Sequence, residues 1–580
     1  MYVKTAIRRT KDGQEIRYLQ LAHNEWDADA QRSRTKVLHS FGRADQLDRA
    51  AIERLVVSLG RLLDPDRAAT LSARPGLDFL EARPLGGTHV LDGLWRRLGI
   101  AATMTRLLSG RRMGARAERA LFALVANRAL APSSKLAATE WISADVHIDG
   151  LADIDEQACY RAMDWLAEIE PDLAKEVYFQ VTDLLNLEVD LIFFDTTSTY
   201  FETGQADEAI ARDERGHRLD QPATSSAGRD RDEDDPEDGQ KVQLRGFRSY
   251  GKSKDSRPDL PQVVVGMAVT REGIPVRVWS WPGSTGDSAL IRQVRDDLRE
   301  WTLSKVIYVA DRGFSSTKNR RHLMRGGTGY IIGEKLRSGT AEAKAALSRQ
   351  GRYAAVADNL QVKEVKIGSQ DRFIICYNPE AAVRDAAVRE QLLAQLTEMI
   401  DGTDKLRATK RAELAGVIST KPGLHRFLRT TPGGLLRIDR AKVERETNLD
   451  GKYLLRCSDP SLSPEDVALG YKQLLEVERG WRDMKSIIDL RPVYHRREDR
   501  IRAHVLLCWL ALLLIRVAEN AAGQTWTTMR AELQRLHAIT YTGPSGTFRQ
   551  TTELTKPQRD LLAALGVPAP KKILDLAVAD

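Results

Sequence analysis

Three carboxylates are the side chains of this chain best suited to chemistry. Asp195 follows the apolar run 191–194, and Asp311 follows the apolar run 306–310. Glu478 lies far downstream in a charged stretch with helical periodicity. Carboxylates are the ligands that hard divalent cations prefer. Three of them on different elements of one fold predict a two-metal site for phosphoryl transfer on nucleic acid.

Each acid has an expected place in such a site. We expect Asp195 to bridge two Mg²⁺ ions, with Mn²⁺ able to substitute, and Asp311 and Glu478 each to complete the ligands on one side. The three acids are therefore predicted to be both the catalytic residues and the metal ligands.

The stretch around Glu478 favours contact with phosphates. At 100° per residue, Tyr471, Glu478, Arg482 and Lys485 fall on one face of a helix predicted over 467–488. Cations beside a metal-binding acid can neutralise the phosphates of DNA. Tyr471, Arg482 and Lys485 are therefore predicted to contact DNA.

The elements that must position the acids predict an α/β fold. Strand-like runs alternate with helical ones in the order strand, hairpin, helix, strand, helix, strand, which fits a mixed sheet flanked by helices. We expect Asp195 and Asp311 at the C-terminal ends of neighbouring strands, where sites of open α/β sheets lie. The predicted strands are 191–195, 262–270, 274–279, 306–310 and 330–332, and the predicted helix is 288–301.

The rest of the chain divides into further segments. A hairpin is predicted from strands 2–7 and 16–21 around the turn 11–13, followed by a strand at 35–41 and a helix at 44–63. The predicted segments are an N-terminal β-hairpin plus helix (1–63), a helical module that binds DNA ends (64–185), the first part of the catalytic core (186–334) with a mobile loop (203–256), an α+β insertion (335–465), the second part of the core with the glutamate helix (466–525), and a C-terminal tail (526–580).

Composition narrows the class of protein. The chain has 580 residues, enough for two to four domains, and a net charge of +7, which permits an anionic partner such as DNA. None of its four cysteines lies in a C-x-x-C pair, so buried thiols are expected and a disulfide framework or zinc site is not. The apolar run 505–515 is shorter than the ~20 residues that span a bilayer, which predicts a core helix. We expect a cytoplasmic protein without a membrane partner, associated with the nucleoid when bound to DNA.

The residues around the three acids resemble a family, the DDE transposases of bacterial insertion sequences. The branch concerned is the insertion sequence four-like superfamily, whose glutamate helix carries a Tyr–Arg–Glu–Lys signature. Tyr471, Glu478 and Lys485 match its spacing of seven and seven residues. The arginine of the signature falls on Leu474, a departure from the pattern. Further motifs match in order at 194–199, 251–262, 282–287, 310–314 and 494–504.

The resemblance implies a fold and a reaction. It implies a ribonuclease-H-like catalytic core interrupted by an insertion domain. It also implies an enzyme that binds the terminal inverted repeats of its element, cuts the 3′ strand ends with water, and lets the freed 3′ hydroxyls attack target DNA. Family members work as synaptic dimers, so a homodimer is implied as well.

Two other functions remain open from the sequence alone. A catalytically decayed relative would still bind DNA, and Leu474 in place of the signature's arginine is the only hint of decay. A structure-selective nuclease on the same fold would cut branched DNA without terminal repeats. The intact acids argue against decay. The cations that could replace the missing arginine are Arg479 and Arg482.

Overall fold

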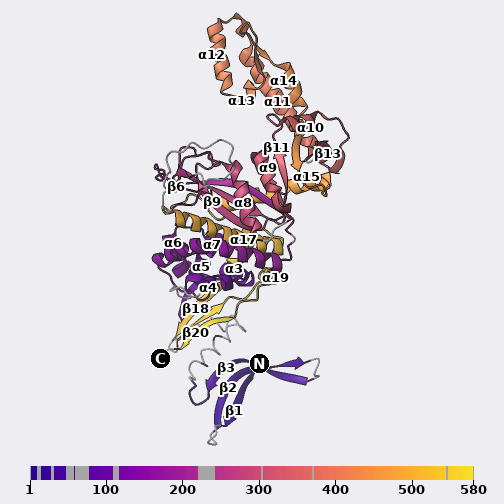
Figure 1. Ribbon diagram of the computed structural model, residues 1–580. Helices are drawn as coiled ribbons and strands as arrows, with labels where there is room; N and C mark the ends of the chain where they lie inside the picture. Colours follow the sequence, from indigo (N-terminus) through magenta and orange to yellow (C-terminus); the bar gives the residue numbers. More distant parts are fainter. Residues whose placement is uncertain are drawn as a thin grey trace, which may run out of the picture. The chain divides into compact units, whose positions relative to one another are not determined.

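The structure is a computed structural model (Figure 1). It describes residues 2–9, 15–27, 32–47, 52, 58, 78–108, 116–187, 189–213, 215–219, 242–301, 305–368, 371–543 and 546–578. Contacts within the chain divide it into two units. The first unit comprises residues 1–89, 144–147 and 531–580, and the second comprises 90–143 and 148–530.

The N-terminal strands of the first unit form a three-stranded antiparallel sheet of order β1-β2-β3. β1 (Tyr2–Arg9) pairs with β2 (Glu15–Asp27), and β2 pairs with β3 (Arg32–Arg43). The predicted hairpin and third strand are therefore confirmed. The predicted turn 11–13 and most of the predicted helix 44–63 lie outside the described residues.

The first unit also holds a four-stranded sheet of order β20-β19-β18-β4. Its strands are β4 (Asp78–Pro84), β18 (His537–Gly543), β19 (Gly546–Thr551) and β20 (Ile573–Val578), with helix α19 (Lys556–Ala564) between the last two. The three strands of the C-terminal tail, predicted over 526–580, are not among the strands predicted from the sequence. The missed strands are short, and β18 pairs with β4, which lies more than four hundred residues earlier in the chain.

The second unit is built on a nine-stranded sheet of order β12-β13-β14-β17-β11-β10-β5-β8-β9. β5, β8 and β9 are antiparallel neighbours, whereas β10 and β11 run parallel to β5. The predicted mixed sheet is confirmed. The bounds of these strands are β5 Leu191–Tyr200, β8 Gln262–Val269, β9 Pro275–Pro282, β10 Ile307–Ala310 and β11 Gly329–Glu334.

Strands from the predicted insertion extend this same sheet. β17 (Lys452–Cys457) pairs antiparallel with β11, and β14 (Asp371–Tyr377), β13 (Leu360–Ile367) and β12 (Ala354–Ala357) follow outward. The helical part of the segment has a hydrophobic core of its own, around Leu396 and Phe427. It consists of α11 (Pro379–Ile400), α12 (Ala408–Ser419), α13 (Pro422–His425), β15 (Leu428–Thr430), β16 (Leu436–Ile438) and α14 (Arg440–Thr447), and α10 (Ala341–Ser348) packs on β13 and β14.

Long helices lie beside the sheet, with α7 and α17 next to each other (Figure 1). Among the described helices, α17 alone is long and apolar enough to cross a membrane, but 94% of its most apolar window is buried inside the molecule, as a core helix requires. Helices precede β5 within the predicted helical module 64–185, which also contains strand β4. They are α3 (Gly86–Arg97), α4 (Ile100–Leu108), α5 (Arg116–Leu130), α6 (Lys135–Glu140), a π-helix (Trp141–Asp145) and α7 (Glu156–Leu184), and α17 spans Glu498–Ala522.

The polar stretch 203–256, predicted to be a mobile loop, is structured at both ends. β6 (Ile210–Arg212) pairs with β7 (Gln243–Arg245), and the buried guanidinium of Arg212 lies 2.7 Å from Glu498 at the start of α17. Ion pairs hold these segments where apolar side chains are scarce. Residues 220–241, which include the acidic run, lie outside the described residues.

Candidate active site

The register of two parallel strands places Asp195 beside Asp311. β10 pairs with β5 from Ile307↔Leu191 to Ala310↔Phe194, and the next residue of each chain segment is an aspartate. Hydrogen-bonded strands lie roughly 4.8 Å apart, and residues at one register position share a face of the sheet. The two carboxylates therefore start from adjacent positions on one face, on neighbouring strands as predicted.

One part of this prediction was wrong. Asp311 does follow the end of β10, but Asp195 lies in the middle of β5, which continues to Tyr200. Beyond Asp195 the strand still pairs with β8, up to Tyr200↔Gln262. The residues 196–199 are β-branched or small and buried, so they favour a strand although they are polar.

Glu478 and Asp311 both lie within electrostatic reach of Asp195. Burial raises the pKa of Asp195 above its ordinary value, and the negative charges of Asp311 and Glu478 raise it further. The ammonium of Lys254 acts in the opposite direction, lowering that pKa. A bound cation would relieve the repulsion among the three carboxylates, because opposite charges favour the ionised form.

The helix predicted over 467–488 is observed as two helices. α15 (Pro464–Lys472) ends and α16 (Leu475–Ser486) begins at a tight turn, where the N–H of Leu474 donates to the carbonyl of Tyr471 at 3.0 Å. The single helical face assumed for Tyr471 and the residues after it is therefore interrupted. Leu474 itself is buried, with 8% of its surface exposed.

Tyr471 contacts the second acid directly. Its hydroxyl donates a hydrogen bond to Oδ1 of Asp311 at 3.2 Å, and its ring stacks on Tyr453 with 6.0 Å between centroids. A Cβ on Gly333 would lie 2.6 Å from the Tyr471 hydroxyl oxygen, so the glycine makes room for this contact. Burial, more than the charge of Asp311, raises the pKa of Tyr471 well above its ordinary value, so the phenol is a neutral donor.

The packing of α16 sets the place of Glu478, which is exposed. α16 packs on β5 and β8. A Cβ on Gly480 would lie 2.5 Å from the terminal methyl carbon of Met267, which is the β8 partner of Asp195. The glycine thus lets the glutamate helix approach the sheet next to the first acid.

The other predicted DNA contacts have different surroundings. Arg482 is exposed. Lys485 is mostly buried, and its Nζ donates to Oδ1 of Asp255 at 2.7 Å. Arg479, one of the two possible substitutes for the missing arginine, donates to Glu519 on α17 at 3.0 Å. Arg482 is therefore the better placed of the two substitutes.

Sequence reasoning missed two residues next to the acids, Lys254 and Asp255. Both belong to the matching motif 251–262, which was the available signal, but nothing in the sequence paired them with residues far away. Lys254 lies beside Asp195, and Asp255 binds the α16 lysine.

The donor set fits divalent cations in kind, although it is not a finished metal site. In the part of the chain that the structure describes, no three acidic, histidine or cysteine side chains stand close enough to hold a metal ion. Asp311 and Glu478 are exposed and therefore accessible to an ion beside Asp195. Hard oxygen ligands from three elements are what Mg²⁺-type ions require.

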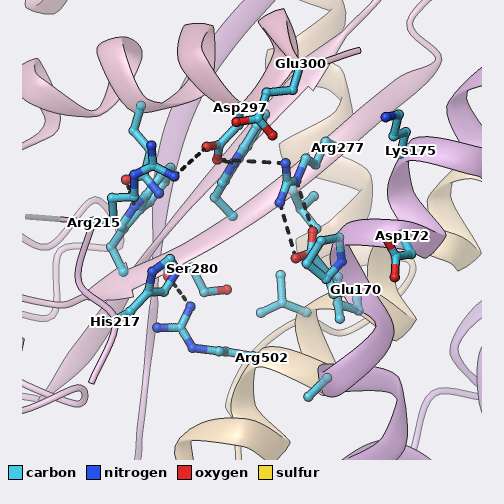
Figure 2. A pocket seen from close by; sticks show the side chains of 18 of the residues that line it. Glu170, Asp172, Lys175, Arg215, His217, Arg277, Ser280, Asp297, Glu300 and Arg502 are labelled. Carbon is cyan, nitrogen blue, oxygen red and sulfur yellow. Dashed lines mark hydrogen bonds and ion pairs between the residues drawn. The ribbon is translucent and has the colours of Figure 1, made fainter. Parts of the chain in front are cut away.

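A separate cavity lies at the β9 edge of the sheet. It has a volume of about 370 Å³ and is lined by residues of α7, β9, α8 (Leu290–Arg299) and α17 (Figure 2). Arg277 crosses it, donating to Glu170 at 3.0 Å and lying 3.8 Å from Asp297. None of the three acids lines this cavity, and its arginines Arg277 and Arg215 pair with the acids Glu170 and Asp297. The candidate active site is therefore assigned to Asp195, Asp311 and Glu478, and not to this cavity.

Comparisons with known proteins agree with the sequence motifs. The model of the transposase DDE domain matches residues 238–514, and that of the IS1634 family transposase N-terminal domain matches residues 3–70. The first match includes Asp311 and Glu478 but begins after Asp195. A comparison with curated proteins gives no match.

One solved structure with some likeness is a piggyBac transposase synaptic complex with hairpin DNA. It is 12% identical, with 77% of this chain and 76% of that chain covered and a TM-score of 0.32, too distant to bear on the fold or the function.

The family models define the class as enzymes that cut and transfer DNA with divalent metal ions. The two matched domains identify the chain as a DDE transposase of a bacterial insertion sequence, a class of proteins that bind DNA.

Proposed function

We propose that Asp195, Asp311 and Glu478 are the catalytic acids of this transposase and hold two Mg²⁺ ions, for which Mn²⁺ can substitute. The observation that carries the proposal is the convergence of the three acids: two follow the last register pair of parallel strands, and Glu478 raises the pKa of Asp195. The core strand order β9-β8-β5-β10-β11, with the first three antiparallel and the last two parallel, supports a ribonuclease-H-like core.

The protein's own side chains prepare the site for in-line displacement. When bound, divalent ions activate an oxygen nucleophile and stabilise the leaving oxygen. Tyr471 fixes Oδ1 of Asp311 through its hydroxyl, so this acid presents a defined orientation. Lys254 places a positive charge beside Asp195, which lowers the pKa of that acid and so opposes the effect of burial. Arg482 is exposed on α16 and supplies a cation for the DNA backbone. It would replace the arginine of the family signature, whose position is occupied by Leu474 in this chain.

The substrate we propose is the terminal inverted repeats of the chain's own element. Water cuts the 3′ strand ends, and the 3′ hydroxyls then attack target DNA. A homodimer brings the two ends together in a synaptic complex. The protein works in the cytoplasm and is nucleoid-associated when bound to DNA. Helices in the predicted end-binding module, residues 64–185, carry arginines that suit contact with phosphates.

The experiment is a cleavage assay with labelled DNA that carries the element's ends, in Mg²⁺ and in Mn²⁺. Glu478→Gln and Asp311→Asn are expected to abolish cutting while end binding persists. Glu476→Gln is the matched control, because this acid lies two residues away on α16 and pairs with Arg479. Normal cutting by Asp311→Asn would sink the assignment of that acid.

The same assay separates the two alternatives. Tight binding of the ends by the wild type without any cleaved product would favour the decayed relative. Equal cutting of branched junctions and repeat ends would favour the structure-selective nuclease.

A further inference from the structure

The segment 253–255 holds the strand that carries the first acid. The backbone N–H of Lys254 donates to Oγ of Ser198 at 2.8 Å, and its Nζ donates to the carbonyl of Thr196 at 2.6 Å. Both acceptors belong to β5, and Thr196 adjoins Asp195. Lys254 therefore fixes this segment to the strand at the catalytic position.

The next residue of the same segment holds the helix that carries the third acid. Asp255 is buried, with 2% of its side chain exposed, and its Oδ1 accepts from Nζ of Lys485 at 2.7 Å. The guanidinium of Arg491 binds the same oxygen. Lys485 lies on α16, two helical turns after Glu478. Asp255 therefore ties the glutamate helix to the segment that grips β5.

A third contact reaches the surroundings of the second acid. Nζ of Lys254 lies 3.1 Å from Oδ2 of Asp287, the first residue of the 3₁₀ helix η2 (Asp287–Ala289). η2 packs against η3 (Arg312–Phe314), which directly follows Asp311. Lys254 and Asp255 thus connect β5, which carries Asp195, with α16, which carries Glu478. Through η2 they also connect to η3, which follows Asp311.

The energetics favour a tight connection. A buried carboxylate is costly unless it is paired, and loss of one partner of a buried ion pair is strongly destabilising. Asp255 has two cationic partners from the segment that contains α16 and the loop after it. Movement of α16 away from β5 would leave these charges buried without partners, so the separation of the two elements is strongly determined.

We propose that Lys254 and Asp255 are positioning residues, which set the distance between Asp195 and Glu478 and so assemble the metal site. The inference rests on the proposed function of the three acids. It also assigns Lys485 a structural role through Asp255, in place of a direct contact with a phosphate.

The first test compares Asp255→Asn with wild type and with Asp259→Asn. Asp259 is a matched control, since it lies in the same segment but is exposed and pairs locally with Arg257. Loss of outer contacts to metal ligands lowers metal affinity or activity by about 10- to 100-fold. We expect Asp255→Asn to raise the Mg²⁺ concentration for half-maximal cleavage by that factor. Metal-free affinity for the DNA ends, measured by fluorescence anisotropy, should stay within about twofold.

The second test is a double-mutant cycle between Asp255→Asn and Lys485→Gln. If the two side chains act through their ion pair, the double variant will cleave no worse than Asp255→Asn alone. Multiplying effects, with weaker DNA binding by Lys485→Gln, would overturn the proposal in favour of a phosphate contact. If Asp255→Asn does not fold by circular dichroism, Lys254→Gln, whose side chain is 30% exposed, carries the same metal titration.

The outcomes keep the two proposals apart. Wild type that fails to cut its ends in any divalent metal overturns the proposed function. Wild type that cuts, with Asp255→Asn equal to it in metal requirement, overturns only the positioning role.

Discussion

The hydroxyl of Tyr471 donates a hydrogen bond to Oδ1 of Asp311 at 3.2 Å, which joins the tyrosine of α15 to the acid that follows β10. The sequence pattern places this tyrosine with Glu478 on one predicted helical face. Here its hydroxyl is bound to the carboxylate of another element. Its contribution to the reaction should therefore pass through Asp311, because the hydroxyl orients that side chain.

Replacement of Tyr471 by Phe should slow cleavage more than it weakens DNA binding. One hydrogen bond to a charged acceptor contributes about 1.5–3 kcal/mol, which corresponds to a rate loss of roughly 10- to 100-fold if it is needed in the transition state. Single-turnover cleavage rates and anisotropy titrations measure the two quantities. Tyr453→Phe, a neighbouring ring without a contact to the acids, is the control. A large loss of DNA affinity with an unchanged rate would show that Tyr471 acts on DNA instead.

Replacement of Gly480 by Ala should force the end of the Met267 side chain, opposite Asp195 on the sheet, to move. The new Cβ would meet the Met267 methyl at 2.5 Å, and because this side chain is flexible the cost should fall at the low end of the roughly 1–3 kcal/mol typical of overpacking. We expect lower thermal stability and weaker cleavage in differential scanning fluorimetry and the cleavage assay. Gly416→Ala is the control, since it lies inside α12 with nothing within 4 Å of its Cβ and should stabilise the chain. Equal behaviour of the two variants would contradict close packing at Gly480.

Arg482→Gln should weaken DNA binding without changing the fold. An exposed cation that contacts a phosphate contributes to the salt dependence of binding, so the slope of log K against log salt should fall by about one. The matched control is Arg479→Gln, on the same helix but bound to Glu519. If the two variants have equal slopes, Arg482 makes no phosphate contact.

Because Lys135 is buried, the free energy of unfolding should depend on pH. Burial, helped by the positive charge of Arg128, lowers the pKa of Lys135 to about 7. Its neighbours include His495 and His504, whose own pKa values are lowered by burial and by Lys135. Below pH 7 the folded chain must bury a charged lysine, whereas the unfolded chain keeps it charged up to a pKa of about 10.4 at no cost.

Lys135→Met should therefore be more stable than wild type at pH 7, by roughly 2–4 kcal/mol. The difference should shrink as the pH rises from 7 to about 10, because the wild type then sheds the proton in both states. Urea unfolding at several pH values measures this difference. Lys410→Met, at an exposed lysine of α12, should show no such trend. A constant difference across the range would mean that Lys135 stays charged when buried.

Much of the sheet could be predicted because its strands are apolar and separated by turns. The runs 191–194 and 306–310 are buried in the core, and periodicity identifies such strands well. The end of β5 was misplaced because polar β-branched residues continue a strand that hydropathy appears to stop. The C-terminal strands were missed because β18 gains its partner, β4, only in the folded chain.

The three acids could be predicted from residue type and local context. The residues that position them could not be predicted in this way. The contact between Asp255 and Lys485 joins positions 230 residues apart, and no local pattern encodes such a pair. Likewise, nothing near Gly480 in the sequence indicates the methyl group of Met267. Long-range packing determines these relationships, whereas propensity and spacing determine the elements.

The antiparallel pairing of β11 with β17 has a consequence for which insertions and deletions the chain can tolerate. The chain leaves the catalytic sheet after Glu334 and returns at Lys452 on the adjacent strand. β14 and β17 are antiparallel as well, with Tyr377 opposite Lys452, and the helical part of the excursion lies between these two residues. Strands in this arrangement can be joined by a tight turn of two to five residues. The helical part, which has a core of its own, is thus a module that can be lengthened, shortened or exchanged while β13 and β14, on which α15 packs, stay in place.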